Sequence, residues 1–194
     1  MRTSFVLLAA IAAPAFAADE DRFLQIVPAK TLPAIESVSI YPSAGIKPGK
    51  ERPKPGAVLK FDKAAATVKT RIGDEAVHVF IKPRDGIEVM VAANVLVKPG
   101  QTYELKLGDL LGVVEVFQKD GFPKVDRIVL TAPDDSGPDE KGHAAVQTGS
   151  DYRVEMPAPE GFYAVWLVPA NGARATRIED RIRVLPGKIV RIGN

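Results

Sequence analysis

Apolar and polar residues alternate along most of this 194-residue chain. Val38 and Ile40 are spaced for one face of a strand, and Leu105 and Leu107 repeat that spacing further along. A period of two is typical of β-strands that bury one side. The sixteen glycines and sixteen prolines punctuate the alternating runs and supply turn residues. The pattern therefore predicts a nearly all-β protein.

The order of these runs repeats in the second part of the chain. Residues 32–40 match residues 122–130, residues 79–86 match residues 165–172, and residues 95–100 match residues 182–187. The hairpin-type dipeptides Asp85-Gly86 and Asn171-Gly172 fall at equivalent places in the two copies. Because the matched blocks keep one order, the sequence predicts the duplication of a unit of roughly 88 residues. The alternative is one larger sandwich.

Each copy contains about seven short strands separated by turn signals, which suits an antiparallel β-sandwich. We therefore predict two tandem β-sandwich modules of the immunoglobulin or fibronectin III kind. This resemblance is one of architecture and carries no function with it. The predicted modules span residues 18–108 and 109–194, with almost no linker between them. The modules are therefore expected to hold a restricted relative orientation.

Residues 1–17 have the pattern of a secretory signal peptide and not of a folded element. Arg2 gives a short positive end, residues 5–13 are apolar, and residues 15–17 fit the small-x-small cleavage pattern. The apolar run is too short for a stable membrane anchor, and no later segment approaches the length of a transmembrane helix. We expect an exported chain that begins at Ala18, is periplasmic or secreted, and has no membrane span.

The chain contains no cysteine, which excludes disulfides, thiol nucleophiles and thiolate metal sites. Its 26 basic and 24 acidic residues nearly balance, so no nucleic acid partner is expected. Charge is less evenly distributed along the chain. A basic loop contains Lys47, Lys50, Arg52 and Lys54, and an acidic loop at the same place in the repeat contains Asp134, Asp135, Asp139 and Glu140. Attraction between these loops is one interpretation, and two solvated loops are the other.

No set of residues assembles a recognisable active site. His78 shares a strand with apolar neighbours and is replaced by Ala164 in the second copy, and His143 lies in a predicted loop. Neither histidine has a partner at metal-ligand spacing or a serine and aspartate in a nucleophile motif. We therefore predict no catalytic residue, no cofactor and no metal site. The acidic loop offers oxygen ligands for Ca²⁺ without matching an EF-hand, so calcium binding is an alternative to a solvated turn there.

Three residues are candidates for binding. Trp166, the only tryptophan, alternates with Val165 and Leu167, so it is expected on the face opposite the core. There it packs within the module or between modules, or it stacks on a sugar or peptide ligand. Arg181 and Arg183 alternate with apolar residues. They are expected on the outward side of a strand, either as a cationic patch for an anionic partner or as an ordinary solvated face.

Three classes of function follow from the sequence. We favour a non-catalytic envelope protein whose tandem sandwiches act as a binding or structural module for another envelope protein or a cell-wall polymer. The second class is a carbohydrate-binding module that uses an exposed aromatic residue at Trp166, Tyr163 or Tyr41. The third is an enzyme in which carboxylates or the two histidines converge in a cleft between the modules. The sequence does not predict the oligomeric state.

Overall fold

The computed structural model describes residues 21–46, 51–61, 66–118, 125–138, 144–148 and 152–193. These residues form fourteen β-strands and two short 3₁₀ helices. Outside them lie the predicted signal peptide at 1–17, Lys47 and Lys50 of the basic loop, Asp139 and Glu140 of the acidic loop, and His143. Within the described ranges, no helix is long and apolar enough to cross a membrane.

The first half of the molecule forms two sheets. Its strands are β1 (Arg22–Val27), β2 (Ile35–Pro42), β3 (Ala57–Lys60), β4 (Val68–Ile72), β5 (Ala76–Pro83), β6 (Val89–Leu96) and β7 (Thr102–Lys106), and the 3₁₀ helix η1 (Ser43–Gly45) follows β2. One sheet has the strand order β4-β1-β7 and the other has the order β3-β2-β5-β6. The pairs are antiparallel except for β1 with β7, which run parallel.

The second half repeats this arrangement strand for strand. After the 3₁₀ helix η2 (Leu107–Asp109) come β8 (Leu111–Phe117), β9 (Arg127–Thr131), β10 (Ala144–Gln147), β11 (Arg153–Pro159), β12 (Gly161–Val168), β13 (Thr176–Val184) and β14 (Ile189–Ile192). The sheets have the orders β11-β8-β14 and β10-β9-β12-β13, so β1 corresponds to β8 and β6 to β13. β8 and β14 are again a parallel pair.

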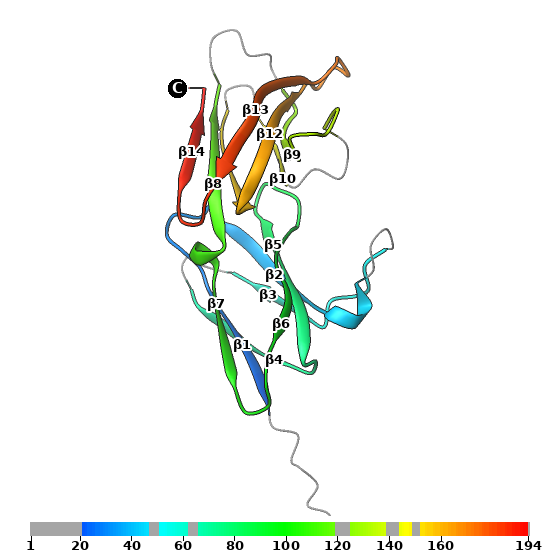
Figure 1. The fold of residues 1–194 in the computed structure, drawn as a ribbon, viewed down its shortest axis with the longest axis vertical. Coiled ribbons are helices and arrows are strands. Elements are labelled where there is room, and N and C mark those ends of the chain that lie inside the picture. Colours follow the sequence, from blue (N-terminus) through cyan, green and yellow to red (C-terminus); the bar gives the residue numbers. More distant parts are fainter. Residues whose placement is uncertain are drawn as a thin grey trace, which may run out of the picture.

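This repeat confirms the predicted fold class of two tandem β-sandwiches, whose halves lie end to end along the longest axis (Figure 1). Even the irregularities repeat, because the register of β5 with β6 shifts around Val79 and that of β12 with β13 shifts around Val165. An immunoglobulin constant domain has the strand orders ABED and CFG. Here the first strand of each half pairs with the fourth and the seventh. The halves therefore share the two-layer architecture and have a strand order of their own.

The inward positions of both halves form one connected apolar core. Ile40 and Ile81 in the first half and Leu167 in the second are at most 2% exposed, at positions that the alternation predicts to face inward. The core continues through the junction because Leu107 and Leu111, on either side of η2, are fully buried. The boundary predicted between the modules falls within η2.

A turn of the first half docks onto the edge of the second half. Between β5 and β6, the Ile87 N–H donates to the Ala145 carbonyl oxygen at 3.1 Å, and the Gln147 N–H donates to the Asp85 carbonyl oxygen at 3.3 Å. Gly86 lies between these bonds, where a Cβ atom would be 3.1 Å from the same Ala145 oxygen. The docked turn connects the halves and covers part of the β10 edge. This cover is useful because an unpaired edge strand invites association with other chains.

Candidate binding surfaces

Trp166 lies on the outer side of its sheet but is only 8% exposed. It packs with Val129 and Ala164 in a small apolar cluster, apart from the main core that contains Val165. Its indole N–H donates to the Thr131 hydroxyl oxygen at 3.0 Å. A buried indole with a satisfied N–H offers little surface to a ligand. The arrangement favours packing within the module over a stacking platform.

Arg177 lies over the indole ring of this cluster. Its guanidinium carbon is 5.5 Å from the ring centre, within cation–π range. The same guanidinium donates to the carbonyl oxygens of Pro133 and Asp180, both at 2.7 Å. The first half covers an aromatic ring at the equivalent position in the same manner, with Arg52 4.3 Å from the ring centre of Phe80. Both outer faces therefore use an arginine to cover a packed ring.

An exposed aromatic residue of the second half is Phe162, which is 46% exposed near the start of β12. Arg181 and Arg183 lie beside it on β13, with guanidinium carbons 4.5 Å and 5.9 Å from the ring centre. Ile182 and Val184 are buried, so the alternation along the strand turns both arginines outward. We refer to Phe162, Arg181 and Arg183 as the Phe162 patch.

Alternation along the strand predicted both arginines of this patch as candidates for binding, whereas Phe162 was not predicted from the sequence. Leu167 pairs with Thr176 next to the hairpin turn, so simple counting places Arg181 opposite Phe162. Two register shifts move the partner of Phe162 to Arg183. Both arginines consequently end up beside the ring. The spacing of the two strands from the hairpin turn was a signal available in the sequence. It places Arg181 beside Phe162 without the register shifts and Arg183 beside it with them.

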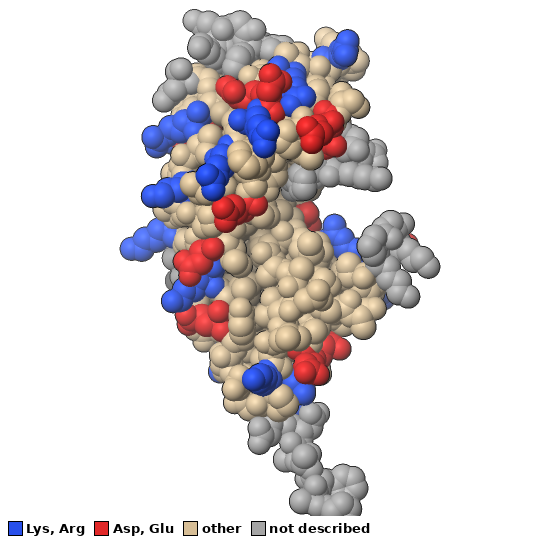
Figure 2. Space-filling view, viewed as in Figure 1, with Lys and Arg blue, Asp and Glu red and all other residues tan. Residues whose placement is uncertain are grey.

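Charge distinguishes the two equivalent edge strands. β13 contains three arginines and two acidic residues, whereas β6 contains no charged residue. The surface over β6 is uncharged in Figure 2, and charged side chains of both signs gather over the second half. Met90 and Leu96 of β6 are 44% and 63% exposed. The shifted register of β6 and the left-handed backbone of Asn94, at φ 52°, bend this edge and discourage pairing with another strand.

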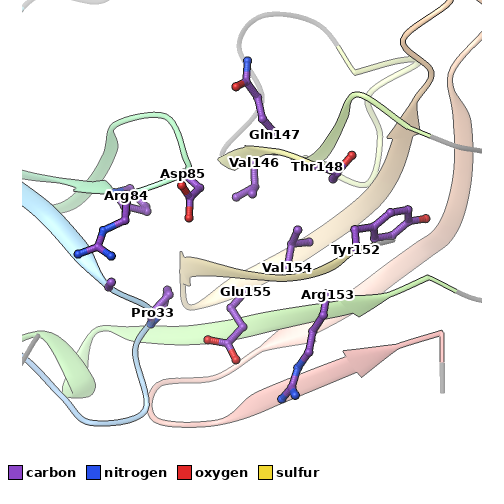
Figure 3. A pocket seen from close by; sticks show the side chains of 12 residues that line it. Pro33, Arg84, Asp85, Val146, Gln147, Thr148, Tyr152, Arg153, Val154 and Glu155 are labelled. Carbon is purple, nitrogen blue, oxygen red and sulfur yellow. The ribbon is translucent and has the colours of Figure 1, made fainter. Parts of the chain in front are cut away.

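Two clefts lie between the halves, and the docked turn contributes to both. The first has a volume of about 400 Å³, and its wall includes Asp85 from the turn and Glu155 from β11 (Figure 3). The second has a volume of about 420 Å³ and is lined by Lys82, Arg84 and Arg127 among others. Two carboxylates therefore line the first cleft, while no histidine of the described residues lines either cleft.

The other residues considered for chemistry lie apart from these clefts. His78 is on β5, and its Nδ1 atom is buried without a hydrogen-bond partner among the described residues. In the acidic loop, the Asp135 carboxylate accepts a hydrogen bond from the Ala132 N–H at 3.0 Å. Within the described parts of the chain, no group of three His, Cys, Asp or Glu residues is placed to hold a metal ion. The calcium alternative depends also on residues outside those parts.

A buried carboxylate on β8 is held by arginines from both neighbouring strands. Glu115 is 2% exposed, and its two oxygens lie 2.7 Å from Arg153 Nε and 2.9 Å from Arg191 Nε. The hydrogen bond from Arg191 lowers the pKa of the Glu115 carboxyl below its ordinary value, burial opposes this effect, and Arg153 adds to the lowering. These contacts join the three strands of the sheet, so both arginines are engaged in structure.

Comparisons with known proteins assign no family to the chain. No protein-family model and no curated protein matches it. Two solved structures are similar along most of its length: the TIE protein of Bacillus anthracis, at 16% identity and a TM-score of 0.31, and a leucine-rich repeat protein from Bacteroides thetaiotaomicron, at 12% identity and a TM-score of 0.24. They cover 88% and 90% of this chain, which spans 33% and 26% of theirs. Likenesses this weak carry no argument about function.

Proposed function

We propose that the protein is an exported, non-catalytic binding module of the cell envelope that holds an anionic partner on the Phe162 patch. The observation that carries this proposal is an exposed ring with an arginine at 4.5 Å and another at 5.9 Å. A guanidinium that lies over an aromatic face keeps its N–H edges free for carboxylate or phosphate oxygens. The patch therefore offers a partner both apolar contact and charge-assisted hydrogen bonds.

The arginines of the patch are free to engage such a partner. Arg181 has no ion-pair partner among the described residues, and Arg183 has only a contact of 3.8 Å with the carboxylate of Glu160. Exposed ion pairs of this kind contribute about 0–1 kcal/mol to stability, so displacing the Glu160 contact would cost a binding partner little free energy. A polymer or protein surface that carries carboxylates or phosphates suits this chemistry.

A carbohydrate-binding module is the second candidate. The exposed fractions of the aromatic side chains indicate which residue would stack on the sugar. Phe162 is 46% exposed and Trp166 is 8% exposed, so a sugar ring would reach the phenylalanine and not the tryptophan. Stacking on Phe162 depends on contact area and not on charge. The two candidates therefore differ in their response to salt.

The test is binding of the full chain to polygalacturonic acid, with neutral dextran as the control polymer. Replacement of Arg181 and Arg183 by Ala is expected to weaken binding by at least about tenfold, equivalent to about 1.4 kcal/mol. Binding should also fall steeply as salt rises, because screening shortens the reach of exposed charges. The double variant Arg174→Ala with Lys188→Ala removes the same charge from exposed positions outside the patch and should bind as the wild type does.

Three results would contradict the proposal. Equal weakening in the control double variant would show that net charge, and not the patch, attracts the polymer. Binding to dextran that is lost in Phe162→Ala and insensitive to salt would favour the carbohydrate candidate. Turnover of a substrate that is lost in His78→Ala would show that the protein is an enzyme.

A further inference from the structure

The second cleft between the halves is a candidate site in its own right. Its volume of about 420 Å³ is within the range of small-molecule sites, roughly 300–1,000 Å³. Lys82 and Arg84 line it from the first half and Arg127 from the second, with Asp85 as the one acidic residue of the wall. The cleft is therefore cationic, and it is separate from the Phe162 patch.

The two arginines of this cleft have no ion pair among the described residues. The Nε atom of Arg127 is buried and has no hydrogen-bond partner among the described residues. Buried donors in folded proteins almost always have an acceptor. Lys82 is already paired with Glu36 at 2.8 Å, whereas Arg84 has no ion pair among the described residues. Two arginines, one from each half, therefore line the cleft without an ion pair among the described residues.

We propose that this cleft binds a small molecule through an oxyanion held between Arg84 and Arg127. A guanidinium presents its N–H groups in a planar fork that matches a carboxylate or phosphate group. Asp85 lines the same cleft and accepts hydrogen bonds, so it suits a hydroxyl group on the same ligand and repels a polyanion. A sugar acid and a sugar phosphate share the required chemistry.

Such a ligand connects the two halves. Arg84 precedes the turn whose backbone pairs with β10, and Arg127 begins β9, the neighbour of β10 in the sheet. An oxyanion between them would add a contact across the junction where two backbone hydrogen bonds now hold the turn. Because a ligand that binds only the folded state stabilises it, binding is expected to raise the melting temperature of the full chain.

The test is an NMR titration of the full chain with D-galacturonate, glucose 6-phosphate and neutral glucose. We expect one or both anionic sugars to shift the amide signals of Gly86, Ile87 and Gln147, and glucose to leave them unchanged. A response to either anion alone supports the proposal and identifies the source of the oxyanion. No response to either anion would show that the cleft holds only water and would overturn the proposal.

Variants separate this site from general charge. Arg84→Ala and Arg127→Ala should each weaken binding about tenfold, as expected for loss of a charge-assisted hydrogen bond. Arg127→Lys keeps the charge and loses the planar fork, so it should also weaken binding while preserving the fold. Arg174→Ala, at an exposed arginine outside the cleft, is the matched control. Equal affinities of the Arg127 and Arg174 variants would overturn the proposal, and loss of polymer binding at the Phe162 patch would not affect it.

Discussion

At the scale of single residues, Glu115 shows how this fold accommodates a buried charge. A carboxylate that is 2% exposed requires compensation, because burial favours its neutral form. Two arginines supply that compensation from β11 and β14, and the hydrogen bond from Arg191 is the largest contribution to the lowered pKa. The carboxylate therefore stays charged when folded at pH values where an unfolded chain would begin to protonate it.

This difference predicts a pH-dependent contribution to stability. Since the pKa of Glu115 is lower in the folded state, the unfolded chain binds the proton first as pH falls. The stabilisation is complete above the ordinary pKa of glutamate and is lost as pH falls through the folded pKa. Urea unfolding over a pH series should show wild type more stable than Glu115→Gln at neutral pH, with the gap closing in acid. Glu179→Gln, at an exposed position of β13, is the matched control, and a gap between wild type and Glu115→Gln that is independent of pH would contradict the assignment.

At the scale of elements, the two equivalent hairpin turns have different roles. Both are marked by the dipeptides that the sequence analysis identified, Asp85-Gly86 and Asn171-Gly172. Gly86 lies against β10, whereas Gly172 has φ 73° and no atom within 4 Å of an added Cβ. Local sequence specifies a turn at both places. It does not specify docking, which depends on the edge of a strand that lies about sixty residues further along the chain.

Replacement of Gly86 by valine should release the docked turn. An added Cβ would lie 3.1 Å from the Ala145 carbonyl oxygen and 3.3 Å from Pro83 side-chain atoms, so the turn must move away from β10. We expect a loss of about 1–3 kcal/mol, the usual cost of crowding a packed site. Amide exchange should quicken at Ile87 and Gln147, the two donors across the junction. Gly73→Val, in a turn with nothing within 4 Å, is the control, and equal exchange in both variants would show that the turn is not held by this contact.

At the scale of the whole molecule, period-two alternation and turn residues were sufficient to predict the fold class. They could not predict the strand order, because pairing between distant strands depends on which faces are buried together. The same limit applies to the surfaces. Alternation placed Trp166 on the outer side of its sheet, but its burial depends on Thr131 of β9 and Arg177 of β13. Arg127 is a single charge in a strand, which predicts no site by itself. Its place in the wall of a cleft depends on both halves, which are distant in the sequence.

The duplication also predicts that each half can fold by itself. The second half has both of its sheets within residues 111–192, so a fragment of residues 109–194 should fold cooperatively, with β-type circular dichroism and a sigmoidal melt. It should be less stable than the full chain, because it lacks the buried side chain of Leu107 and the two hydrogen bonds that cover β10. A fragment that begins at Leu107 should recover part of the difference. With β10 uncovered, either fragment should also associate more readily at high concentration, which sedimentation would detect. Fragments that stay disordered while the full chain folds would show instead that the connected core makes one inseparable unit.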